Sequence, residues 1–224
     1  MLTANPTSKL GGLVLWGDYD DLSAHYDLVH QVCGQDGPLP YDVGEFVLGL
    51  AYDLRKAKEG QRLTREVQRL GGDSKRLYGV EIVWTFLLPQ VAILRGAAAF
   101  MVLTSRDQAM MWELEAAVEE AAEEGFGTDI GRAVIDRMRR LRSGPWPDLI
   151  EKSKTRSAYF LDRSGKAARK SSIVPVMDSM NPMYEANASL GMNKVAIAEG
   201  RMIDPKDFKT YTEIHEEVCA GAKL

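Results

Sequence analysis

The sequence predicts an α+β protein that is predominantly helical, with a small N-terminal β-hairpin or sheet. Helices are expected because several long segments repeat their apolar residues at intervals of three and four, the spacing of one helical face. A hairpin is expected at the start because residues 13–16 form a continuous apolar run that favours a strand. Residues 5–8 are rich in turn-forming side chains, so residues 1–4 are predicted to be the partner strand.

Two helices and a second hairpin are expected next. An aspartate within residues 18–21 can cap a helix that ends at Gly34. A second helix is expected over residues 43–59, after a loop rich in Gly and Pro. Residues 62–70 and 77–83 flank a Gly-Gly-Asp turn and are therefore predicted to pair as strands, with continuation into a helix as the alternative.

The middle of the chain predicts two further helices. Proline favours the first turn of a helix, so Pro89 predicts a helix over residues 89–103. Ser105 and Gln108 have the spacing of a capping box, which predicts a helix over residues 105–124.

The clearest break in the chain is the Gly-Pro-Trp-Pro sequence at residues 144–147. Before it, Asp129 can cap another helix. We therefore predict a main domain over residues 1–144 and a C-terminal appendage or small second module over residues 145–224. Within the second part, residues 152–170 are basic and loosely patterned, which predicts a mobile arm or a short helix that gains order by docking.

The last part of the chain predicts two helices. One is expected around residues 182–190 and ends at Gly191. The other begins at Asp204, where a capping aspartate precedes a proline. Its expected apolar stripe consists of Phe208, Tyr211, Ile214 and Val218.

The composition is that of an ordinary folded protein, with 45% hydrophobic and 27% charged residues. The most apolar segment is free of charge only over residues 82–94, which is shorter than the roughly 20 residues of a membrane-spanning helix. No membrane association is therefore expected. The first residues lack the pattern of a signal peptide and the two cysteines lie far apart, so a cytoplasmic location is expected.

The net charge of −4 is unevenly distributed. Residues 128–170 carry twelve Lys and Arg against five Asp and Glu, whereas residues 1–127 are acidic. This basic segment can bind nucleic acid or another acidic partner, or it can dock on the acidic half of its own chain. The candidate binding residues are Arg132, Arg139, Arg140, Arg142, Lys152, Arg156 and Tyr159.

A metal site is a weaker possibility near the N-terminus. The candidate ligands are Asp18, Asp21, His25 and His30. The two histidines are five residues apart, which places them about 140° apart around a helix. We therefore expect the aspartates to cap the helix and expect no metal or cofactor, with a metal-dependent enzyme as one alternative.

Four polar residues are candidates for structural ion pairs: Asp18, Asp53, Arg55 and Glu81. Asp53 and Arg55 cannot face one another on a helix, so each is expected to pair with another segment. Glu81 lies among apolar residues and, if buried, needs a cation such as Arg55 or Arg95.

Three segments resemble an uncharacterised bacterial domain family, a domain of unknown function. They are residues 12–22 (GLVLWGDYDDL), 47–55 (VLGLAYDLR) and 79–84 (GVEIVW). The resemblance covers the first half of the chain only and implies no activity.

The sequence favours a function in protein interaction or regulation without catalysis. It contains neither the Gly-x-Ser-x-Gly motif of a serine nucleophile nor a phosphate-binding loop. Homo-oligomerisation is expected because Met110, Met111 and Trp112 are consecutive on a predicted helix and cannot all face one core. The expected partner is a second copy or another protein, and nucleic acid binding through residues 132–170 is the first alternative.

Overall fold

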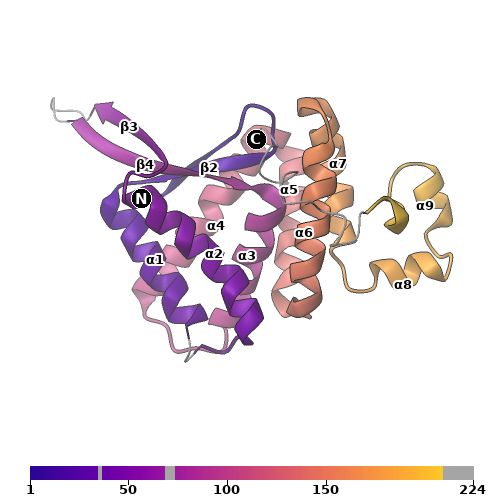
Figure 1. Ribbon diagram of the computed structural model, residues 1–224, viewed down its shortest axis with the longest axis horizontal. Coiled ribbons are helices and arrows are strands. Elements are labelled where there is room, and N and C mark those ends of the chain that lie inside the picture. Colours follow the sequence, from indigo (N-terminus) through magenta and orange to yellow (C-terminus); the bar gives the residue numbers. More distant parts are fainter. Residues whose placement is uncertain (35–36, 69–73, 209–224) are drawn as a thin grey trace.

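A four-stranded antiparallel sheet forms one side of the computed structural model, which describes residues 1–34, 37–68 and 74–208 (Figure 1). Its strands are β1 (Thr3–Pro6), β2 (Gly12–Gly17), β3 (Leu63–Gln68) and β4 (Ser74–Val83), in the order β1-β2-β4-β3. Both expected hairpins are confirmed, and the β3–β4 hairpin projects beyond the helices in Figure 1.

The helices cover one face of this sheet. Leu13, Leu15 and Val80 are fully buried on that face, whereas Val14 and Trp16 on the other are partly exposed. This alternation is typical of a strand with one solvated face. The sheet therefore presents its buried face to α1 (Tyr19–Cys33), α2 (Tyr41–Lys58) and the central helix α3 (Trp84–Ala98).

The start of α1 follows the expectation. Asp18 is the N-cap, and it forms a reciprocal capping box with Asp21. Gly34 ends the helix, with its N–H donating to the carbonyl of His30.

The start of α3 does not follow the expectation. The helix begins at Trp84, directly after β4, so that Pro89 lies inside it rather than in its first turn. It also ends at Ala98, five residues before the predicted end at residue 103. The helix forms despite the hydrogen bond that Pro89 cannot donate, because every residue except Phe86 and Arg95 is buried. Burial on all sides outweighs the local proline signal.

The acidic helix α4 (Ser105–Phe126) and the basic helix α5 (Thr128–Arg140) follow. The cap of α4 is Thr104 with Asp107, one residue before the predicted pair Ser105 and Gln108. Asp129 lies in the first turn of α5 and does not cap it. Gly127 instead links the two helices with a φ of 85°, a conformation that favours glycine.

The segment predicted as a mobile arm or short helix forms two ordered helices, α6 (Trp146–Asp162) and α7 (Gly165–Ser179), after the short 3-10 helix η1 (Leu141–Ser143). Phe160 and Ile173 join the common core, and α6 packs against α3. The helical pattern is obscured in the sequence because the buried face of α6 includes polar residues such as Ser153 and Ser157. The Ser157 hydroxyl lies 2.6 Å from that of Thr85 on α3.

The described chain ends in short helices, α8 (Tyr184–Ser189), α9 (Lys194–Ala198) and the 3-10 helix η2 (Pro205–Asp207). Asp204 caps η2 as expected. The stripe predicted beyond it extends past residue 208, outside the described residues, and the division of the chain after residue 144 stays a prediction. Over the described residues, no helix combines the length and hydrophobicity needed to cross a membrane.

Candidate interaction surface

The four candidate metal ligands differ in their burial and in their hydrogen-bond partners, and they do not form one cluster. Asp18 and Asp21 cap α1, and Asp18 also pairs with Lys75 on β4. His25 is buried, with Nδ1 2.8 Å from the carbonyl oxygen of Asp21 and Nε2 3.1 Å from that of Met110. His30 is exposed on another side of the helix. No group of three or more His, Cys, Asp and Glu side chains that could hold a metal ion occurs in the described ranges. His25 thus links α1 to α4 through the carbonyl of Met110.

The Asp18 carboxyl makes a testable contribution to acid stability. Partial burial alone would raise its pKa, but the hydrogen bonds from Lys75 and from the Asp21 N–H lower it from 3.8 to about 2. A carboxyl with a lowered pKa stabilises the fold above about pH 4, and this stabilisation is lost as the pH falls towards 2.

Replacement of Asp18 by asparagine keeps the cap but removes the charge. We expect wild type to exceed Asp18→Asn in free energy of unfolding by less than about 1 kcal/mol at pH 6, and this difference to vanish near pH 2. Urea unfolding at the two pH values measures it. A difference that is independent of pH would show that the pair with Lys75 does not form in solution.

The remaining structural candidates occupy three separate places. Asp53 lies 3.6 Å from Arg62, and burial raises the pKa of its carboxyl while Arg62 opposes this rise. The guanidinium of Arg55 stacks over the ring of Tyr52. Glu81 is exposed and therefore needs no buried cation.

Three arginines of α5 and η1 pair with acidic residues of α4. Arg132 pairs with Glu123 at 3.0 Å, and Arg139 pairs with Glu119 at 2.9 Å. Arg142 lies 3.0 Å from Glu115, which is buried and also binds Arg95 at 2.6 Å. Much of the charge of the basic segment is therefore balanced within the chain. Arg140 is exposed.

Two candidate cations of α6 are buried and hold the C-terminal part of the fold. Lys152 donates to the carbonyl of Asn181, and Arg156 donates to Ser179 and Glu185. Burial lowers the pKa of both side chains. Tyr159 is half-buried, between Arg163 and Phe208. The seven candidate binding residues therefore do not share one surface.

An open groove runs along α4 beside the start of the chain, with a volume of about 580 Å³. Residues 1–3 form one wall of the groove, and the exposed face of α4 forms the other. The α4 residues that line the groove are Arg106, Ala109, Met110, Trp112, Glu113, Ala116, Ala117 and Glu120. The large apolar residues in the lining are Met1, Leu2, Met110 and Trp112.

The three consecutive large residues of α4 point in different directions. Met111 is buried, Met110 is half-buried, and Trp112 is 60% exposed. The guanidinium of Arg95 lies 4.5 Å from the centre of the Trp112 ring, and Glu115 holds that guanidinium in place. Trp112 is thus an exposed aromatic side chain whose ring is held by its contact with Arg95. Such a side chain is typical of the residues that contribute most to binding in protein interfaces.

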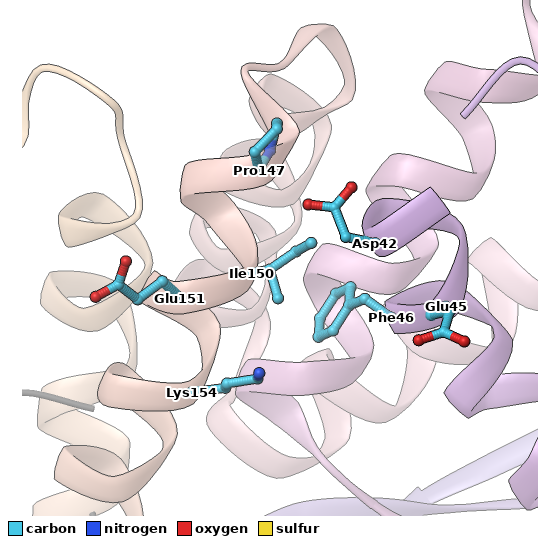
Figure 2. Close-up of a pocket in the computed structure, with 7 residues that line it drawn as sticks. All are labelled: Asp42, Glu45, Phe46, Pro147, Ile150, Glu151 and Lys154. Atoms are coloured by element: carbon cyan, nitrogen blue, oxygen red, sulfur yellow. The ribbon is translucent and has the colours of Figure 1, made fainter. Parts of the chain in front are cut away.

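A second cleft, of about 670 Å³, lies between α2 and α6 (Figure 2). Phe46 and Ile150 face each other across it and form an apolar floor. Figure 2 shows Asp42 pointing between the helices, whereas Glu45 and Glu151 point away from each other.

Comparison with known families agrees with the resemblance and extends it. The model of a family described as a domain of unknown function, DUF6904, matches residues 2–196, and the chain belongs to this family. The match covers most of the chain rather than only its first half, and it continues across residue 144. No curated protein and no solved structure gives a significant match to the chain.

Proposed function

We propose that this protein is a non-catalytic interaction protein that binds another protein chain through the groove on α4. The observation that carries the proposal is the exposed Trp112, which contacts Arg95 and lines the same groove as Met1 and Leu2. Aromatic side chains in such grooves supply a large share of the binding energy in protein interfaces.

The polar residues support an interaction role more than a catalytic one. His25, the buried histidine of α1, has both ring nitrogens next to backbone carbonyls. Buried Glu115 lies between two arginines, and buried Arg156 is bound to Ser179 and Glu185. These groups are engaged in joining helices, which makes them structural.

Site-specific photo-crosslinking in cells tests this proposal. A photoreactive phenylalanine derivative replaces Ala109, an exposed residue in the groove, and a matched variant carries it at Ala167, which is exposed on α7. We expect a protein adduct from position 109 and none from position 167, with the partner identified by mass spectrometry. Equal labelling from both positions, or none from either, would contradict the proposal.

A further inference from the structure

We infer that the partner in this groove is a second copy of the chain, packed antiparallel along α4 about a two-fold axis. The inference rests on the proposed function and specifies the occupant of the same groove. Three features of α4 support it: the spacing of its exposed residues, their size, and the signs of their charges.

The groove follows a seam of alternating three- and four-residue steps. The seam consists of Arg106, Ala109, Glu113, Ala116 and Glu120. This alternation is the spacing of residues that two packed helices present to each other. All five lie on the solvent side of α4, since four are exposed and Glu113 is half-buried.

The size of the side chains suits close packing of two identical helices. Ala109 and Ala116 are seven residues apart and leave room for another helix backbone. In an antiparallel pair centred between residues 112 and 113, Ala109 of each copy lies opposite Ala116 of the other. Each Trp112 then covers apolar surface beside the seam, and the same surface is buried on both copies, as a two-fold interface requires.

The charges at the two ends of the seam fix the direction. Arg106 and Glu120 are 14 residues apart, about 21 Å along the helix. Neither side chain forms an ion pair or hydrogen bond with another residue in the described part of the chain. An antiparallel arrangement brings Arg106 of each copy to Glu120 of the other, whereas a parallel one places like charges side by side.

The acidic residue at the centre of the seam does not oppose this arrangement. The Glu113 carboxylate accepts a hydrogen bond of 2.8 Å from the Leu2 N–H. Its other oxygen lies 3.6 Å from Nε2 of His25. Glu113 is thus held towards its own chain, away from the second Glu113.

Charge reversal at the two ends gives a matched test. In a dimer of Arg106→Glu, each new glutamate lies opposite Glu120 of the other copy. In a dimer of Glu120→Arg, each new arginine lies opposite Arg106 of the other copy. Each single variant is expected to raise the dimer dissociation constant about tenfold, because both symmetric contacts become repulsive. An equimolar mixture of the two variants restores both opposite-charge contacts and is expected to form heterodimers as tightly as wild type. Sedimentation velocity measures all four samples.

The outcomes separate this inference from the proposed function. A wild-type protein that stays monomeric up to about 100 μM would overturn the dimer. So would single variants that dimerise like wild type, or a mixture that dimerises no better than they do. If crosslinking from position 109 meanwhile captures a different, identified protein, the proposed function stands and the second copy is wrong. Absence of any adduct from position 109 would contradict both.

Discussion

Replacement of Trp84 by alanine is expected to lower the free energy of unfolding by about 3–5 kcal/mol. Trp84 is fully buried where β4 passes directly into α3. Its ring lies 5.3 Å from that of Phe126 at the end of α4. Truncation would leave a cavity between the sheet, the central helix and α4, which the surrounding backbone cannot fill.

Urea unfolding followed by circular dichroism measures this loss, and Trp84→Phe is the control. The indole Nε1 of Trp84 is buried without a hydrogen-bond partner in the described part of the chain. Phenylalanine removes that polar group and retains most of the ring, so it is expected to cost less than about half as much as alanine. A loss below about 1 kcal/mol for Trp84→Ala would contradict the packing of α3 at the centre of the fold.

Replacement of Gly96 by alanine is expected to destabilise the protein, although alanine normally favours a helix over glycine by about 1 kcal/mol. An added Cβ at residue 96 would lie 2.1 Å from the carbonyl oxygen of Arg142. It would also lie 2.9 Å from the ring of Trp146. Because the first atom belongs to backbone, the helices must separate, and we expect a loss of about 1–3 kcal/mol.

Gly49→Ala in α2 is the matched control for this substitution. There the nearest atom to an added Cβ is the side-chain nitrogen of Gln90 at 3.2 Å, which can shift. Its effect on the free energy of unfolding is expected to stay within about 1 kcal/mol of zero. Thermal unfolding of the two variants compares them directly. Similar stabilities would show that α3 does not approach the segment around residue 142 closely.

Local signals predicted the elements whose ends depend on local hydrogen bonds. The cap of α1 at Asp18 and the two hairpins are of this kind, because the residues that form them are close in sequence. The same rules failed for α3, where burial from all sides overrode Pro89. They also failed for α6, whose buried face mixes Lys152, Arg156 and hydroxyl groups with apolar residues such as Phe160. Such a face forms only when tertiary partners satisfy it.

The candidate surface was only partly predictable. The opposite charges of residues 1–127 and 128–170 indicated the contact of α4 with α5. The run from Met110 to Trp112 indicated that at least one of these three large residues faces outward, but not which one. The second wall of the groove was not predictable, because Leu2 and Glu113 meet across more than 100 residues of sequence. The three- and four-residue spacing from Arg106 to Glu120 was present in the sequence but lacked the apolar side chains that usually reveal a seam.

The most direct test of the α4 interface is the mass of wild type and of Trp112→Glu in solution, measured by light scattering during gel filtration. A charge at this exposed position should leave the circular dichroism spectrum of the folded protein unchanged while it separates the two chains. Tyr41→Glu is the control, because Tyr41 is also an exposed aromatic residue but lies at the start of α2. Wild type and Tyr41→Glu are predicted to have twice the mass of the 24.9 kDa chain, and Trp112→Glu the mass of one. The same mass for wild type and Trp112→Glu, whether of one chain or of two, would contradict the interface.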